Sequence, residues 1–325
     1  MMDMLLSSLA VLTRKIGVAL VQLVLIATLV FSIMYVMPGD PVMMLLGAES
    51  DPSPEAVAAM RAKLGLDQPV AVQYASWMTG LLHGDFGRSV TDGYPVADYI
   101  AENLPLTLEL AAAAVVVAMA IGIPLGIVAA LRRGTVVDSL LTSFSTIGIS
   151  LPVYILGAML ILLFALKLDW LPSSGYMNFS RNPPEHFRRL LLPALTLGFG
   201  LSASITRMTR SSVLDILDRD FVRTLRAKGM RERRIIGRHV LRNAAIPIVT
   251  IVGLQLGNLM GGTVLVEAMF NWPGLSTLLV EAVSTRNYPV VQGVILTIAG
   301  LYIFINLAVE LVYLLLDPRI RRRRV

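Results

Sequence analysis

The sequence contains no cysteine, and only 15% of its 325 residues are charged. The absence of cysteine excludes a disulfide framework and any metal site built on thiolates. A soluble globular domain carries about a quarter charged residues, so the shortage of charge excludes that class of protein. Hydrophobic residues make up 55% of the chain, and the mean hydropathy is +0.71. The chain is therefore predicted to be an integral membrane protein.

The sequence also lacks the motifs of a nucleotide-binding enzyme. No glycine is followed directly by lysine, so the chain has no P-loop of the form GxxxxGK[ST] in which to bind ATP. The three histidines, His83, His186 and His239, fall in three different segments and read as ordinary polar loop residues. We therefore expect no catalytic residue, no metal and no cofactor in this chain, and the protein is predicted not to be an enzyme.

Six uncharged runs are candidates to cross a bilayer, which takes about 20 apolar residues in a helix. They cover residues 16–37, 110–131, 139–166, 190–206, 243–266 and 287–309. The first run is too long for the core of a cleavable signal peptide, so it is predicted to remain as a membrane helix. Pro152 inside the third run predicts a kink or a break, and Pro193 lies near the start of the fourth and shortest run. The predicted fold is an all-α membrane protein with six transmembrane helices.

The basic residues indicate the orientation of these helices. With the N-terminus inside, the cytoplasmic segments hold 20 of the 28 Lys and Arg residues. Arg188 and Arg189, on the outer side, depart locally from the positive-inside rule. Both termini are therefore predicted to be cytoplasmic. Because the basic residues gather in short segments beside apolar runs, they indicate contact with membrane lipid rather than with nucleic acid.

The most charged part of the chain is the predicted cytoplasmic loop 211–243. Counted from Arg207, just before the loop, to Arg242, the chain holds eleven basic residues against four acidic ones. Apolar residues first recur at the spacing of a single helix: Leu214, Leu217, Phe221 and Leu225. A second helical pattern follows: Ile235, Ile236, Val240 and Leu241. Lys228 followed by Gly229 predicts a helix end between the two patterns.

Two interpretations of this loop remain open. A basic loop can serve only to fix the topology of the membrane helices. Topology does not, however, require two amphipathic helices around a glycine, and an exposed apolar stripe on a cytosolic helix indicates a docking partner.

The outer segment 38–103 carries nine acidic residues and three basic ones. Residues 54–64 and 70–82 within it are predicted to form short amphipathic helices. The segment is too small for an independent enzyme domain. We expect it either to dock a partner and shape the outer gate or to serve as structural cover.

The membrane runs themselves hold few ionisable residues. Glu109, Asp138, Glu267 and Glu310 fall at or near the ends of the runs, where we expect them to reach water or headgroups. Carboxylates inside a bilayer mark proton and ion pathways, so their absence from the middle of the runs counts against a proton- or sodium-coupled carrier.

Two glycine pairs have the four-residue spacing of tight helix interfaces: Gly122 with Gly126, and Gly253 with Gly257. Such glycines allow close approach either between helices of one chain or between subunits.

The basic loop resembles that of a known family. Its segment Arg223-Thr224-Leu225-Arg226-Ala227-Lys228-Gly229, followed by Leu241 and Arg242, is similar to the cytoplasmic loop of permease subunits of ATP-binding-cassette (ABC) importers for dipeptides and oligopeptides. That loop reads Glu-Ala-Ala, three residues, Gly, nine residues, Ile-x-Leu-Pro. Gly229 and Leu241 fit it. Arg223-Thr224-Leu225 replaces Glu-Ala-Ala, and His239 and Arg242 replace the Ile and the Pro, as in the peptide branch.

Further segments resemble the same permeases in the same order along nearly the whole chain. They are MPGDP (37–41), LGLDQP (64–69), GDFGRS (84–89), LPLTLEL (104–110), FNWPGL (270–275) and DPR (317–319). Any one of these segments is a weak signal, and the ordered set is a strong one.

The resemblance implies the type I ABC importer permease fold in a bacterial inner membrane. It divides the chain into an N-terminal helix with an extracytoplasmic segment (1–102), a permease core (103–317) with the coupling loop 211–243, and a basic cytoplasmic tail (318–325). The implied partners are a second, homologous permease, two ATP-binding-cassette ATPase subunits that bind the ATP, and an extracytoplasmic solute-binding protein.

The identity of the cargo remains open at this point. The resemblance favours dipeptides or oligopeptides, but nickel, glutathione or another small solute fits the same architecture, and no residue can be singled out as a cargo contact. A self-sufficient channel or secondary carrier and a membrane-anchored interaction scaffold are the alternatives from other classes.

Overall fold

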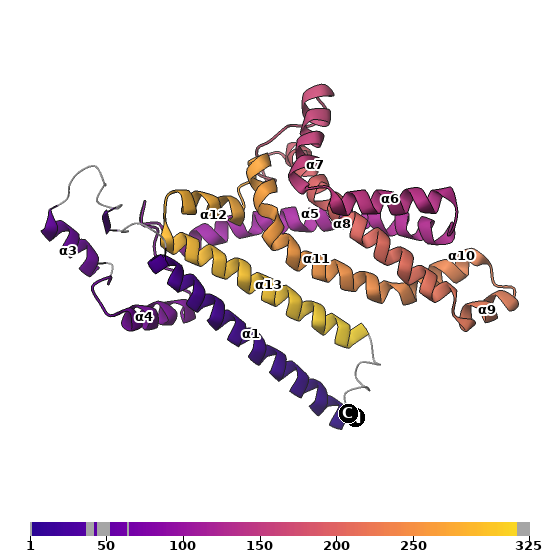
Figure 1. Ribbon diagram of the computed structural model, residues 1–325, viewed down its shortest axis with the longest axis horizontal. Helices are drawn as coiled ribbons and strands as arrows, with labels where there is room; N and C mark the ends of the chain where they lie inside the picture. The colour runs from indigo at the N-terminus through magenta and orange to yellow at the C-terminus, as the bar shows by residue number, and fades with distance from the viewer. Residues whose placement is uncertain (1, 37–41, 44–52, 64, 317–325) are drawn as a thin grey trace. The chain divides into compact units, whose positions relative to one another are not determined.

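The computed structural model describes residues 2–36, 42–43, 53–63 and 65–316. Its regular elements are helices, as Figure 1 shows. They are α1 (Met2–Val36), α3 (Pro54–Lys63), α4 (Val70–Leu82), α5 (Val96–Leu131), α6 (Val136–Ser150), α7 (Val153–Leu160), η1 (Ile161–Lys167), α8 (Pro183–Leu217), α9 (Asp220–Ala227), α10 (Glu232–Arg234), η2 (Ile235–Val240), α11 (Leu241–Phe270), α12 (Leu275–Ser284) and α13 (Tyr288–Leu316). The predicted short helices 54–64 and 70–82 correspond to α3 and α4. The segments 37–41 and 317–319 and the predicted tail 318–325 lie outside the described residues.

Five unbroken helical stretches within the described ranges are long and apolar enough to cross a membrane. They are Thr13–Ser32, Val96–Leu131, Pro183–Leu217, Glu232–Gly257 and Tyr288–Val309. Two helix pairs meet the same test only when each pair is taken together. The all-α membrane fold is confirmed, whereas the count of six crossings and the location of the termini stay predictions.

The predicted third run, 139–166, is not one straight helix. Its two halves, Val136–Ser150 and Val153–Lys167, are bent by 105° relative to each other. The break falls at Leu151 and Pro152, both in extended conformation. This confirms the prediction of a kink or break from Pro152, because proline removes a helical hydrogen bond and disfavours helix in the residue before it.

The predicted fourth run, 190–206, is only the middle of α8. The Asn182 side chain accepts a hydrogen bond from the backbone N–H of Glu185 and caps the helix, and Pro183 and Pro184 occupy its first turn. The helix then continues through Pro193 to Leu217. It packs against α6, α7 and α11 and is the most buried of the five candidate spans. The sequence underestimated its length because both ends of the helix, residues 183–189 and 207–217, are polar.

The chain divides into two compact units. One contains residues 107–272 and 302–316 together with residues 2–9, and the other contains residues 10–106 and 273–301 within the described ranges. In the second unit the start of α5 packs with α12 and the start of α13 around Val96, Leu275, Val290 and Val294, all buried. The basic segment between α8 and α11 belongs to the first unit.

The glycine pairs serve packing within the chain. A Cβ at Gly126 of α5 would lie 2.5 Å from Thr209 Cβ and 2.7 Å from the carbonyl oxygen of Thr206, both on α8. Gly122 has the same relation to α8, and Gly253 and Gly257 of α11 face Val309 and Tyr302 of α13. Of the two expectations, close approach between helices of one chain is therefore confirmed for these four glycines.

Gly126→Ala is expected to destabilise the protein by about 1–3 kcal/mol, because the added methyl meets a backbone carbonyl that cannot rotate away. The matched control is Gly17→Ala in α1, where a Cβ meets nothing within 4 Å. Thermal unfolding of the purified proteins in detergent measures both. Equal Tm values for the two variants would contradict the packing interpretation.

Candidate functional site

The basic segment between α8 and α11 forms short helices around a glycine turn. After α8 ends at Leu217, α9 covers Asp220–Ala227, and the chain then turns into α10, η2 and α11 without a further break. The predicted order of helix, glycine turn and helix is confirmed. The prediction of one helix through 214–225 is wrong, because Asp218 ends α8 and Arg219 is extended. Asp220 in the first turn of α9 is favourable for the helix dipole there, so the aspartates mark a new start rather than a continuation.

Gly229 ends α9 in the left-handed conformation, with φ +73°. Its N–H donates to the carbonyl of Arg226 at 2.9 Å, and the N–H of Met230 donates to the carbonyl of Leu225 at 3.2 Å. These two bonds make a Schellman motif, which usually includes an apolar contact between the residues here numbered 225 and 230. Leu225 and Met230 both pack against the same core. A Cβ at Gly229 would meet nothing within 4 Å, so a side chain would fit there without a clash. Glycine is favoured because of the positive φ angle.

A hydrophobic core lies beneath this turn and joins it to the membrane helices. Its buried members come from α5, α8, α9, η2 and α11: Ala130, Val213, Ile216, Val222, Ile235, Val240, Ala244 and Ile248. Leu214, Leu217 and Leu225 of the predicted stripe pack against it, and only Phe221 remains 38% exposed. The expectation of an exposed apolar stripe is therefore wrong for most of its residues, which the chain itself covers.

The sequence pattern missed Val222, which is completely buried. The turn at Asp218 and Arg219 shifts the phase of the apolar face, so Val222 rather than Phe221 points inward. The signal in the sequence was the pair of aspartates around Arg219, which indicates a helix boundary.

The predicted coupling residues on α9 divide between an outward face and this core. Arg223 is exposed and forms an ion pair with Asp220 at 3.6 Å. The Thr224 hydroxyl donates to the carbonyl of Asp220, and Leu225 faces the core. Ala227 ends α9 and is exposed, as is Lys228.

Arg226 of α9 forms an ion pair across the glycine turn with Glu232 of α10. Its Nη2 and Nε donate to the Glu232 carboxylate at 2.6 and 3.2 Å, and this bonding raises the pKa of Arg226 above its ordinary value. Both side chains are about half exposed, so the pair contributes little to stability. Further along the chain, Leu241 at the start of α11 packs against the core and Arg242 is exposed.

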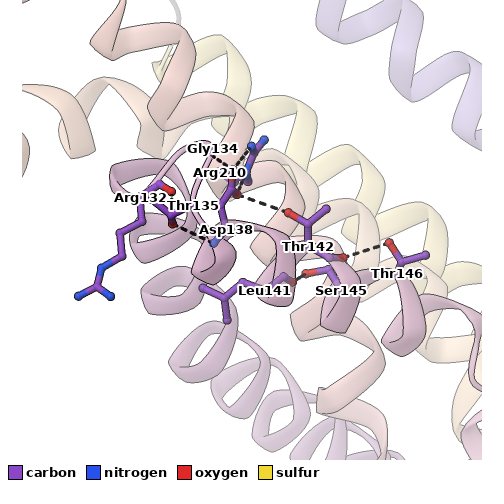
Figure 2. Close-up of polar contacts among 9 residues, drawn as sticks. All are labelled: Arg132, Gly134, Thr135, Asp138, Leu141, Thr142, Ser145, Thr146 and Arg210. Carbon is purple, nitrogen blue, oxygen red and sulfur yellow. Dashed lines mark hydrogen bonds and ion pairs between the residues drawn. The ribbon is translucent and has the colours of Figure 1, made fainter.

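A second polar site, between α6 and α8, was not predicted. Figure 2 shows Asp138 of α6 facing Arg210 of α8. Arg210 donates from Nε to Oδ1 at 2.6 Å and from Nη2 to Oδ2 at 2.8 Å, which is a bidentate ion pair. The backbone N–H of Gly134 also donates to Oδ2, at 3.0 Å. The side chains are only 9% and 29% exposed, so the expectation that Asp138 reaches water is wrong.

This ion pair connects the helix that precedes the basic segment to a further helix, α6. Arg210 lies on α8 two helical turns before its end at Leu217, and Asp138 lies in the first turn of α6. Through Asp138, the turn between α5 and α6 is bound to α8, the helix that precedes α9. The sequence showed both charges at the ends of apolar runs but carried no signal that they pair.

Two further polar groups expected at the surface are buried. Glu267 is fully buried and accepts a hydrogen bond from the Thr107 hydroxyl at 2.9 Å. His186 is 1% exposed and bridges the carbonyl of Met177 at 2.7 Å and Oε1 of Glu109 at 2.8 Å. Both expectations, of a water-reaching Glu267 and of a plain loop histidine, are wrong. The side chain of Glu310 lies outside the described residues.

Among the side chains that the structure describes, no cluster of three or more His, Asp or Glu residues could hold a metal ion. The site thus consists of an exposed, basic α9 held on a core, with a buried ion pair behind it. Such an arrangement suits docking and the transmission of movement.

Known proteins that resemble this chain are membrane components of transport systems. Residues 122–322 match the family described as binding-protein-dependent transport system inner membrane component, and residues 8–111 match its N-terminal membrane component. A probable peptide ABC transporter permease of Sinorhizobium fredii is 38% identical, over 95% of this chain and 98% of its own. The dipeptide transport system permease protein DppB of Escherichia coli is 39% identical, over 96% of this chain and 98% of its own.

A solved structure shows the same fold. The MetNI methionine ABC transporter in an inward-facing conformation contains a chain that matches with a TM-score of 0.57 at 19% identity, covering 67% of this chain and 96% of that one.

Proposed function

The chain belongs to the family of inner-membrane components of binding-protein-dependent transport systems, and from this premise we propose that it is the membrane-spanning permease of an ABC importer for dipeptides or oligopeptides. The observation that carries the proposal is the similarity, over 95–96% of the chain, to permeases named for peptide and dipeptide transport. The chain forms the path, and ATP is hydrolysed by partner subunits.

We place the contact with the ATPase on α9 and the turn that follows it. Phe221 is 38% exposed, more than the other residues of the predicted stripe. Exposed Arg219 and Arg223 lie two positions before and after it in the sequence, and exposed Lys228 follows in the turn. An aromatic side chain within a basic rim is suited to a cleft with apolar walls and acidic edges. Because α9 shares its core with α8 and α11, a displacement of the ATPase would move these helices as one body.

The topology and the assembly complete the proposal. Six crossings with both termini in the cytoplasm place α9 on the side where ATP is available, and the distribution of basic residues supports this. The family description and the relatives' names support ATPase and solute-binding partners. A second, homologous permease and a pair of ATPase subunits complete the assembly that we propose.

The double variant Phe221→Asp/Arg223→Glu tests the docking surface in the co-expressed importer. We expect the amount of ATPase that co-purifies with the permease to fall about tenfold or more. Phe221→Asp removes the aromatic side chain, and Arg223→Glu inverts the charge beside it. Arg181→Glu, an exposed arginine in the α7–α8 connection, is the matched control and should leave assembly unchanged. Retention of the ATPase by the double variant would refute the placement.

Reconstitution of the complete importer into liposomes tests the cargo. ATP-dependent uptake of a labelled dipeptide is expected, with competition by other short peptides. Uptake of nickel or glutathione in place of peptides would refute the peptide assignment, and flux through the permease alone without ATP would refute the importer assignment.

A further inference from the structure

Helix α4 (Val70–Leu82) is apolar and yet lacks a single buried residue. Its sequence, VAVQYASWMTGLL, contains no charged side chain, and Val70, Val72 and Leu82 are exposed by 52%, 50% and 80%. Apolar surface in water costs about 25 cal/mol for each Å², so an uncharged helix of this kind indicates a surface that is covered in the cell.

The attachment of α4 to α1 shows where in the membrane it lies. The hydroxyls of Tyr74 and Thr28 share a hydrogen bond of 2.8 Å, and Tyr35 donates to Oε1 of Gln73 at 2.8 Å. The Phe31 ring packs 5.2 Å from the ring of Tyr74. The membrane-crossing stretch of α1 is Thr13–Ser32, so these contacts hold α4 at the level where that stretch ends.

The aromatic residues at this level are those that favour the membrane boundary. The ring of Trp77 of α4 lies 5.4 Å from that of Phe31. Tyr35 and Tyr74 each pack their ring against Phe31 and have their hydroxyl in a hydrogen bond. Tyrosine and tryptophan are enriched at both bilayer–water interfaces because one end of each side chain is apolar and the other polar.

The apolar surface of α4 also continues that of the membrane span. Val21, Leu25 and Leu29 of α1 are 60%, 59% and 68% exposed within a stretch that crosses the bilayer, so lipid is available to cover them. A cavity of about 340 Å³ lies beside α4, and its lining includes Phe31, Trp77 and no charged residue. Most of the lining surface is apolar and suits an acyl chain, and Gln68, Gln73, Ser76 and Gln292 supply the polar part.

From these observations we propose that α4 lies in the interfacial layer of the bilayer, with phospholipid covering its exposed apolar face. It forms a surface helix that anchors the end of α1, and not a docking site for a soluble protein. The neighbouring α3, with the sequence PEAVAAMRAK, carries charges at Glu55 and Arg61 and faces water. The inference concerns the membrane contact alone and does not depend on the cargo or on the ATPase.

The absence of cysteine in the chain makes a direct test possible. Val72→Cys and Leu82→Cys on α4 are spin-labelled in the complete importer, assembled with cysteine-free partners in phosphatidylcholine vesicles. Ala58→Cys on α3, also exposed, is the matched control. We expect the ratio of collision with oxygen to collision with a water-soluble nickel chelate to be about fivefold higher on α4 than on α3, because oxygen concentrates in lipid.

Two outcomes would overturn the proposal. One is an equal ratio on α4 and α3, which would place α4 in water. The other is a fall in collision with both reagents on α4 when the purified solute-binding protein is added, which would make that protein the cover of α4. Either result leaves uptake by the same labelled importers measurable, so failure of this inference is distinguishable from failure of the proposed function.

Discussion

Gly229→Val is expected to lower ATP-driven uptake by about tenfold or more while the permease still inserts and binds its partners. A residue with a side chain costs about 1–2 kcal/mol in the left-handed region, and a β-branched one costs more. Since 1.4 kcal/mol corresponds to a factor of ten in an equilibrium, the ratio of native to non-native turn would fall by about tenfold. The hydrogen bonds to the carbonyls of Leu225 and Arg226 would then be lost.

Two further variants separate backbone conformation from bulk. Asn tolerates the left-handed region, so Gly229→Asn should retain most of the uptake. Gly237→Ala adds a methyl group at an exposed glycine of the same segment that has no positive φ and open space around it, and it should be close to neutral. The measurement is uptake and ATPase stimulation by the reconstituted importer. Equal losses at positions 229 and 237 would show that any added side chain disrupts docking, which contradicts the conformational explanation.

The packing of α8 is the physical reason for expecting a large loss of uptake from a change in the turn at Gly229. The same helix packs closely on α5 through Gly122 and Gly126, and its cytoplasmic end shares a core with α9. Arg210 adds a polar connection to α6. A displacement of α9 therefore reaches three other helices of the same unit through contacts that leave little room for independent movement.

The sequence predicted those features that depend on neighbouring residues. Lys228 and Gly229 marked a helix end, and Pro152 marked a break, because proline and glycine act on the local backbone wherever they occur. The glycine spacing on α5 and α11 predicted close packing, although not with which partner. Resemblance to the importer permeases added the family and the expected role of the loop.

What could not be predicted depends on residues far apart in the chain. Asp138 and Arg210 are 72 positions apart, and a single sequence does not tell a paired carboxylate from one that faces water. Val222 was missed because a two-residue irregularity shifted the phase of a helical pattern that was otherwise regular. The position of Glu267 at the end of an apolar run predicted contact with solvent, but the buried region extends past that run.

Breaking the Asp138–Arg210 pair is the second change with a large expected effect. Removing one partner of a buried ion pair costs about 3–5 kcal/mol, since the other charge is left without compensation. Arg210 is 29% exposed, so water would offset part of this cost, and we expect Arg210→Met to lower stability by about 2 kcal/mol. It should also raise the ATP hydrolysed for each peptide transported, because α6 would follow α8 less closely without its polar connection.

A double-mutant cycle distinguishes this specific pair from a general loss of charge. Asp138→Asn/Arg210→Met should be more stable than the sum of its two single variants predicts, because each single variant leaves an unpaired charge and the double variant leaves none. Arg210→Lys should be intermediate, since lysine cannot make the bidentate contact. Arg133→Met is the matched control: Arg133 pairs with Asp218 at 3.5 Å, but the side chains are 63% and 73% exposed, so Tm should hardly change. If Arg210→Met changed Tm but left the ratio of ATP hydrolysed to peptide transported unaltered, the ion pair would support the fold alone, and transmission from α9 to α6 would have to proceed through the packed side chains of α8.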